Sequence, residues 1–182
     1  MRQGLHTAII GAACLLFAGS VADAAPATLV SPTTLTNPKE AHHVHQVIAL
    51  KFIGGASITR DHADQIGGPA IVYEVELWPH ELELELCAAM LTGPHQRFYP
   101  LELMLKHPFT LGSVVELYIG GGPSLTLDDQ GEAYIGAIAS VGSFFWLTEH
   151  FGLLAEVDYA IVADHGAVNE LELAAGVAWR FD

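Results

Sequence analysis

The chain has 182 residues, of which 51% are hydrophobic and only 15% are charged. Seven Lys+Arg residues stand against 21 Asp+Glu residues, which gives a formal net charge of −14. An acidic balance of this size argues against a nucleic-acid partner, which requires a basic surface, and the apolar content is too high for a disordered chain. The length fits one domain, or two at most.

Residues 1–24 have the features of a secretory signal peptide. Arg2 supplies the positive charge, an apolar run (AIIGAACLLFA) follows, and Ala22-Asp23-Ala24 gives a small-x-small cleavage pattern. The apolar run is shorter than the ~20 residues of a membrane-spanning helix, so we expect cleavage after Ala24 rather than an anchor. Cleavage leaves Cys87 as the single thiol, and no intramolecular disulfide can form.

The mature chain divides into a lead-in and one folded domain. Residues 25–42 are rich in Pro, Thr and Ala without a sustained period, which predicts a flexible segment. From residue 43 to 182, apolar and polar residues alternate in runs separated by turn signals, which predicts β-strands. Eight strands are expected, at residues 44–58, 71–78, 81–91, 98–107, 114–127, 132–147, 152–162 and 169–181. The turns between them include Gly67-Gly68-Pro69 and Pro108 with Gly112.

The alternation separates each strand into an apolar face and a polar face, because successive side chains of a strand point to opposite sides. Leu82, Leu84 and Leu86 are typical of the apolar face; the strand at 132–147 is ambiguous, since both its faces are largely apolar. The polar faces predict an interior polar network of Lys51, Glu74, Glu76, Glu81, Glu83, Glu85, Glu102, Lys106, Glu116, Glu156, Asp158, Glu170, Glu172 and Arg180. So few bases cannot neutralise so many acids, so we expect enclosed water and some protonated carboxyls.

Two architectures fit strands of this kind. In a soluble exported barrel of the lipocalin type, the leucine face would line a pocket for a small apolar ligand and the acids would face water. In an outer-membrane barrel, the leucine face would face lipid and the acids would be enclosed. Trp78, Trp146 and Trp179 end alternate strands, so with both termini on one side they reach the same rim and, with Phe181, predict an aromatic girdle. The girdle favours the membrane architecture.

Four stretches carry a resemblance to a known family: GPAIVYE from Gly68, LKHPF from Leu105, YIGGGP from Tyr118 and the final strand ending VAWRF. In these the chain resembles the small eight-stranded outer-membrane β-barrel proteins with short loops, although Asp182 follows the aromatic residue on which such strands usually end. The resemblance implies an all-β, eight-stranded, antiparallel, up-and-down transmembrane β-barrel in the outer membrane. It also implies outer-membrane lipid and the barrel-assembly machinery as partners, and we expect a monomer.

No motif predicts an enzyme, a metal or a cofactor. His42, His43 and His45 form a cluster on the lead-in that we expect to be solvated rather than metal-binding. The glycine run at Gly120 is not followed by a helix, which argues against a phosphate site. Glu81, Glu83 and Glu85 have a spacing compatible with paired-carboxylate hydrolysis, but a lining role in the interior is favoured.

Three functions therefore remain open. We expect a structural or interaction role in the envelope without an open pore, because the interior of an eight-stranded barrel is filled by side chains. The outward loops are predicted at residues 59–69, 92–97, 128–131 and 163–168, too short for a large binding surface. The first alternative is the soluble lipocalin-like barrel. The second is a lipid-modifying enzyme resembling the lipid A deacylases, whose His-x-Ser pair does not occur in this sequence.

Overall fold

The computed structural model describes residues 44–59, 62–94, 96–112, 114–163 and 167–181. The predicted signal peptide (1–24) and lead-in (25–42) lie outside these residues, as do His42 and His43. Nowhere in the described ranges is there a helix long and apolar enough to cross a membrane.

The described chain forms one antiparallel sheet of nine segments. They are β1 (Gln46–Ile58), β2 (Ala63–Trp78), β3 (Leu82–Ala89), β4 (Leu91–Thr92), β5 (Arg97–Leu111), β6 (Val115–Asp128), β7 (Ala133–Trp146), β8 (Phe151–Ala163) and β9 (Ala167–Phe181). β3 and β4 are two parts of one strand that is interrupted at Met90, because both pair with β2 on one side and β5 on the other. The sheet therefore contains eight strands.

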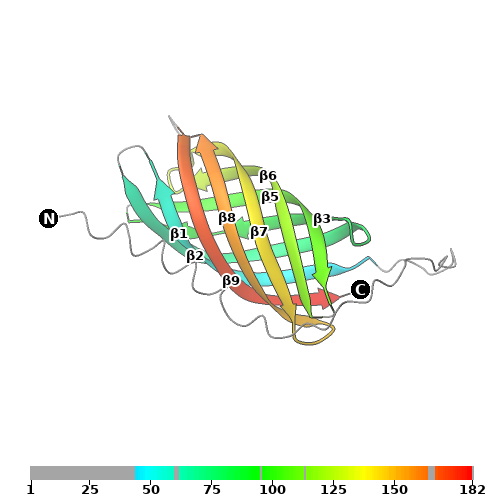
Figure 1. Cartoon of the computed structure of the whole chain (residues 1–182). Coiled ribbons are helices and arrows are strands. Elements are labelled where there is room, and N and C mark those ends of the chain that lie inside the picture. Colours follow the sequence, from blue (N-terminus) through cyan, green and yellow to red (C-terminus); the bar gives the residue numbers. More distant parts are fainter. Residues whose placement is uncertain (1–43, 60–61, 95, 113, 164–166, 182) are drawn as a thin grey trace. The chain divides into compact units, whose positions relative to one another are not determined.

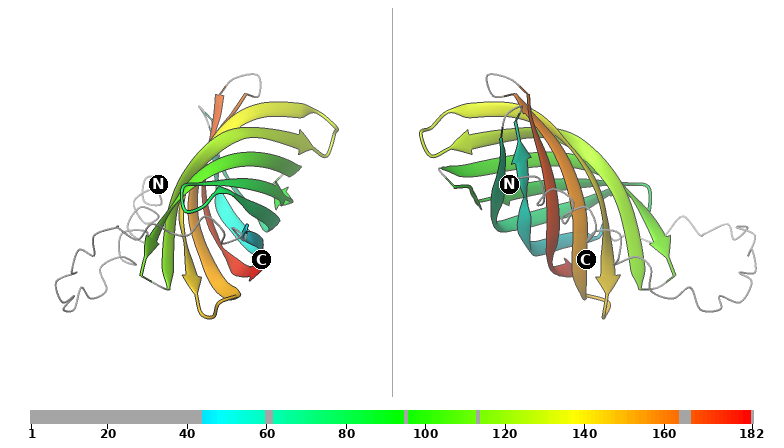
Figure 2. Two further views of the ribbon diagram at one scale, coloured as in Figure 1. Left: turned by 90° about the vertical axis from the view of Figure 1, so that its right-hand side faces the viewer. Right: turned by 60° about the vertical axis from the view of Figure 1, so that its left-hand side comes forward.

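The sheet closes into a barrel because β1 pairs with both β2 and β9 (Figures 1 and 2). The closing register runs from Gln46 opposite Phe181 to Ile58 opposite Asn169, without a gap. Every strand pairs with its neighbours in the sequence, so the topology is up-and-down, and the predicted fold class is confirmed. We call the end at which β1 begins and β9 ends the terminal end, and the other the far end.

One predicted turn is wrong, and another begins later than predicted. β2 begins at Ala63, so Gly67-Gly68-Pro69 lies inside a strand and the first far-end connection is shorter than the predicted 59–69. Gly68 is required there by a close approach: a Cβ atom would run into the carbonyl of Met90, whose N–H donates to the Pro69 carbonyl at 3.0 Å. In β5 the strand continues through Pro108 to Leu111, and the chain turns only at Gly112, with φ of 72°.

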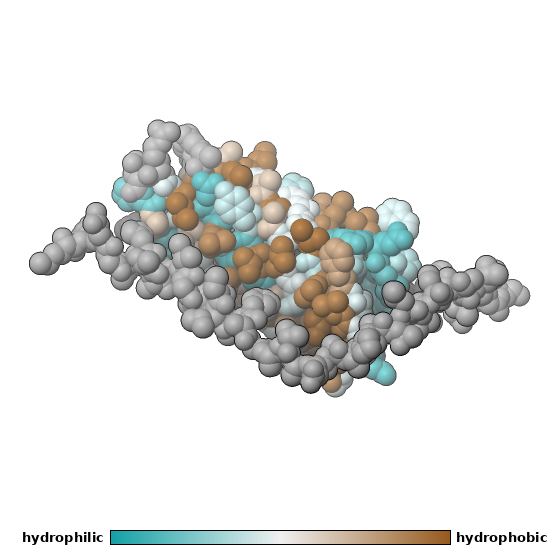
Figure 3. Space-filling view, viewed as in Figure 1, coloured by the Kyte–Doolittle hydropathy of each residue, from teal (hydrophilic) through white to brown (hydrophobic). Residues whose placement is uncertain are grey.

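The polar face of each strand points into the barrel and the apolar face points outward, as in a membrane barrel. On β8, Glu156 and Asp158 are buried while Val157 and Tyr159 between them are 47% and 46% exposed. Leucines such as Leu86 and Leu103 are about half exposed on the outside, and brown apolar side chains spread over the visible barrel wall in Figure 3. The lipocalin-like alternative is wrong, because its apolar pocket would need these leucines on the inner face.

The ambiguous strand at 132–147 is resolved by the same test. In β7, Ile138, Ser140, Phe144 and Trp146 are buried on the inner face, whereas Val141 points outward with 57% exposure. Apolar side chains of other strands join them inside, for example Met104 and Ala160 around Ile138. The core of this barrel is therefore a mixture of apolar and charged side chains.

Candidate functional site

The inner surface of the barrel carries almost all of the predicted polar residues. Its fully buried members are Lys51, Glu74, Glu85, Glu102, Lys106, Glu156, Asp158 and Glu172. The half-buried members are Glu76, Glu83, Glu116, Glu170 and Arg180. Glu81 is the exception: it is exposed in the turn before β3, because the strand pairing shifts between Glu76 and Trp78 and the chain turns at His80, with φ of 59°.

Lys106 of β5 is the centre of the first ionic group. Its ammonium pairs with Glu74 of β2 at 2.9 Å and also with Glu85 of β3. The same nitrogen lies 3.8 Å from the centroid of the Tyr118 ring. The Lys106 side chain has no exposed surface, so its charge depends on these partners for its stabilisation.

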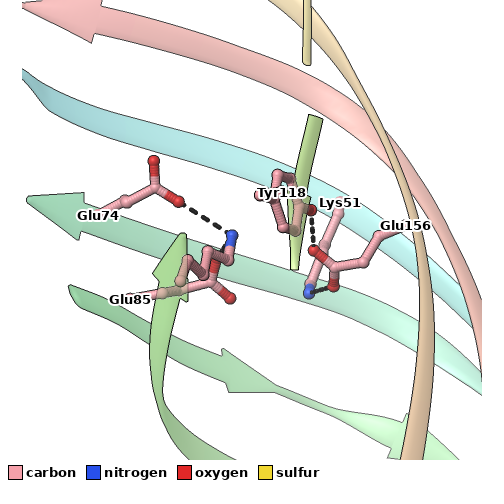
Figure 4. A network of polar contacts seen from close by, with 6 residues as sticks. Lys51, Glu74, Glu85, Tyr118 and Glu156 are labelled. Atoms are coloured by element: carbon pink, nitrogen blue, oxygen red, sulfur yellow. Dashed lines mark hydrogen bonds and ion pairs between the residues drawn. The ribbon is translucent and has the colours of Figure 1, made fainter. Parts of the chain in front are cut away.

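Glu156 of β8 is the centre of the second group (Figure 4). One of its carboxylate oxygens accepts from the Lys51 ammonium of β1, and the other accepts from the Tyr118 hydroxyl of β6. Asp158, two residues further along β8, lies beside Glu156 and Ser140. Tyr118 thus connects the two groups, with its ring against Lys106 and its hydroxyl on Glu156.

Inward-facing glycines create the space for these long side chains. A Cβ atom on Gly142 would collide with the ring and hydroxyl of Tyr118, and one on Gly120 would lie only 2.8 Å from the Lys106 side chain. Both glycines lie inside strands, where the lack of a side chain normally weakens the sheet. Here the lost packing on one strand is replaced by a large polar side chain from another.

Arg180 and Trp146 lie against each other at the terminal end. The guanidinium donates to Glu116 at 2.8 Å, and its central carbon lies 3.8 Å from the Trp146 ring. Trp146 in turn stacks on Phe144, with 5.3 Å between ring centroids. Arg180, Trp146 and Phe144 therefore form one layered group of side chains at the terminal end.

The predicted aromatic girdle is only partly formed. Trp78 and Trp179 are 59% and 54% exposed on the outside, Phe181 is half-buried, and His150 stacks on Trp179. The prediction is wrong for Trp146, which lies on the inner face and is only 7% exposed. It lies an even number of residues from the inward-facing Ser140, and parity along the strand, not position at its end, decides the direction of the side chain.

Pockets open at both ends of the barrel. At the terminal end, a pocket of about 140 Å³ is lined by carboxylates, including Glu74, Glu83 and Glu116, and a wider one of about 530 Å³ lies over Trp146 and Arg180. At the far end, a pocket of about 140 Å³ is lined by Ser57, Thr126, Glu170 and other polar residues.

Within the part of the chain that the structure describes, no group of three or more His, Cys, Asp or Glu residues could hold a metal ion. His45, the described member of the predicted histidine cluster, donates its backbone N–H to Glu76 at 3.5 Å. Cys87 is a buried free thiol.

No protein-family model matches the sequence, and no curated protein matches it. Solved structures do match. Neisserial surface protein A has 18% identity and a TM-score of 0.66, over 75% of this chain and 97% of that one. The Yersinia pestis attachment invasion locus protein Ail has 14% identity and a TM-score of 0.59, over 75% and 98%. The N-terminal β-barrel domain of Pseudomonas aeruginosa OprF has 16% identity and a TM-score of 0.54, over 74% and 97%.

The chain has the fold of a small outer-membrane β-barrel. The matches cover nearly the whole of the solved barrels, so the eight-stranded architecture is shared in full rather than in part. The outer membrane enzyme PagL shares it too, with 10% identity and a TM-score of 0.57 over 70% of this chain and 97% of that one. At these identities the likeness concerns the fold, and the residues of the interior have to be interpreted from this chain itself.

Proposed function

We propose that the chain is a resident of the outer membrane that acts as a closed barrel with a structural or interaction role, with its terminal end in the periplasm. The observation that carries the proposal is the inversion of the two surfaces. Apolar side chains such as Leu50, Phe52 and Ile119 are more than half exposed on the outside, while Lys106 and Glu85 are buried within. In water this arrangement would expose a continuous apolar wall, whereas lipid would solvate it.

A structural or interaction role is favoured over transport of large solutes by what fills the barrel. Tyr118, Phe144 and Lys106 have almost no exposed surface and occupy the interior together with the ionic groups. Connections at the far end are short, since β1 ends at Ile58 and β2 begins at Ala63, and β6 ends at Asp128 and β7 begins at Ala133. Contacts with other envelope components therefore involve the barrel wall and its rims rather than long loops.

The location is tested by fractionation and by gel mobility. The protein is expected in the detergent-solubilised outer-membrane fraction, and an unheated sample should migrate differently from a boiled one because a closed barrel resists unfolding by dodecyl sulfate. A protein that stays in solution without detergent would contradict the proposal.

The role is tested by two further measurements. Planar bilayers containing the folded protein are expected to show no large steady conductance, and cells lacking the gene should show altered sensitivity to detergents or large antibiotics. Conductance steps as large as those of porins would contradict the structural role and indicate transport.

A further inference from the structure

Buried acids and bases follow one another through the barrel from one mouth to the other. At the terminal end, Glu83 lines the carboxylate pocket and lies close to Glu74, which pairs with Lys106. Lys106 also pairs with Glu85. It lies against the ring of Tyr118, whose hydroxyl donates to Glu156. The first half of the barrel therefore has an unbroken file of ionisable groups.

The file continues to the far end along β8 and β9. Glu156 pairs with Lys51, and Asp158 follows Glu156 on the enclosed face of β8. Glu172 of β9 lies opposite Asp158 in the strand register. Glu170 lies two residues from Glu172 on β9, opposite Ser57 in the far-end pocket. Each group in the file is therefore close to another ionisable group, and the two ends of the file open into two different pockets.

Among the residues that the structure describes, several buried oxygens along this file have no hydrogen-bond partner. They belong to Glu85, Ser140 and Asp158, each 1% exposed, and to Ser124, which is 6% exposed. Buried polar oxygens are normally paired, and enclosed water molecules that make two to four hydrogen bonds are the usual partners in polar interiors. These oxygens lie beside the ionisable groups of the file and are additional sites that can accept a proton or transfer one.

The excess of acids over bases in the described interior also favours groups that bind and release protons. Its bases are Lys51, Lys106 and Arg180, and its acids exceed them several-fold. Carboxylates enclosed together with few bases disfavour one another's ionisation, so a share of these acids holds protons. Chains of ionisable residues within a membrane-spanning segment are the groups from which proton relays are built.

We propose that the file from Glu83 to Glu170 is a proton relay through a barrel that is closed to hydrated ions. The inference rests on the proposed membrane location. A proton binds a carboxylate at one mouth, and transfers between neighbouring carboxyls, hydroxyls and enclosed water follow. A different proton leaves a carboxyl at the other mouth, so each group returns to its starting state and one positive charge has crossed. Tyr118 and Phe144 fill the space that a hydrated ion would need.

The relay is tested in liposomes that contain the folded protein, an internal pH-sensitive dye, K⁺ and valinomycin, so that K⁺ movement compensates the charge. After an external pH jump, the internal dye should respond faster than in protein-free liposomes, while an entrapped dye of several hundred daltons is retained. A response equal to that of protein-free liposomes would overturn the relay, and so would release of the entrapped dye, which indicates an open pore.

The file itself is tested where it passes from β8 to β9. Glu172→Gln and Asp158→Asn keep the shape of the side chains, and neither residue is in an ion pair with another described residue. Each should reduce proton flux towards the protein-free rate, whereas Asp129→Asn in the exposed far-end turn makes the same change of charge and should leave it unchanged. Unchanged flux in both folded variants, Glu172→Gln and Asp158→Asn, would overturn the proposed route. Co-flotation with liposomes and the heat-dependent gel shift report insertion separately, so failure of the relay and failure of the membrane location are distinguishable.

Discussion

The outer wall and the interior of this barrel are built from the same strands, yet they follow opposite rules. On the outside, apolar side chains of suitable size are interchangeable, because contacts with lipid do not depend on direction as hydrogen bonds do. Inside, each charged group depends on particular partners, and Lys106 cannot be replaced alone without leaving Glu74 and Glu85 buried without their cation. Tolerance to substitution should therefore differ between the two surfaces, and the differences can be measured.

The largest effect is expected from Lys106→Met. Removing the ammonium leaves Glu74 and Glu85 buried without their cation, which should cost about 3–5 kcal/mol of the free energy of unfolding. Urea titration of the liposome-inserted protein measures this cost. The triple variant K106M/E74Q/E85Q should recover much of the loss, and a K106M protein as stable as the parent would show that the interior tolerates unpaired charge.

A charge on the outer wall should cost less and depend on depth. Leu103 lies in the middle of β5 and is 45% exposed, so Leu103→Arg places a guanidinium in the centre of the bilayer at a cost of about 2–4 kcal/mol. Leu111→Arg, at the end of the same strand, should cost only ~0–1 kcal/mol. Equal effects at the two positions in urea titrations would mean that this wall does not face lipid.

Tyr118→Phe tests a single hydrogen bond within the interior. The ring stays against Lys106, but the hydroxyl that donates to Glu156 is lost. Hydrogen bonds to charged groups contribute about 1.5–3 kcal/mol, so a loss in that range is expected on the same titration. Tyr73→Phe is the matched control, because the Tyr73 hydroxyl donates to Gln46 on the exposed side, and its loss should be close to zero.

Arg180→Met should have a smaller effect, because the terminal end is partly solvated. The change removes the pair with Glu116 and the contact with the Trp146 ring, and the cation–π contact accounts for about 0.5–2 kcal/mol. Tryptophan fluorescence should also become more sensitive to soluble quenchers, since Arg180 covers Trp146. Quenching that stays at the parent level would show that residues other than Arg180 shield Trp146 from the solvent.

The smallest effect is expected in the far-end turn at Asp128. Burial by itself would raise the pKa of this carboxyl, but the N–H groups of Glu132 and Gln130 donate to it and hold the pKa below its usual value of 3.8. A lowered pKa in the folded state means a contribution to stability that is present above pH 3.8 and is lost as the pH falls further. Asp128→Asn should flatten the acid side of the stability profile slightly, and an unchanged profile would contradict this assignment.

Much of the outer wall could be predicted from sequence, and less of the interior. Alternation assigned Leu86, Leu103 and Val157 to one face and Glu85, Glu156 and Asp158 to the other, because side-chain direction along a strand depends only on parity. It failed where parity was not applied or where the strand bounds were wrong: Trp146 points inward, and Glu81 lies in a turn. A count from Ser140 to Trp146 would have corrected the first error.

The sequence by itself determined an acidic, apolar chain of period-two strands with one charged and one apolar face, because period and parity are local properties. Only the tertiary structure decided which face is enclosed, since that depends on how β1 closes on β9. It also decided which charges meet. Lys51 and Glu156 are 105 residues apart in the sequence, and they pair only because the barrel brings β1 and β8 to the same enclosed space, where an unpaired charge would be too costly to bury.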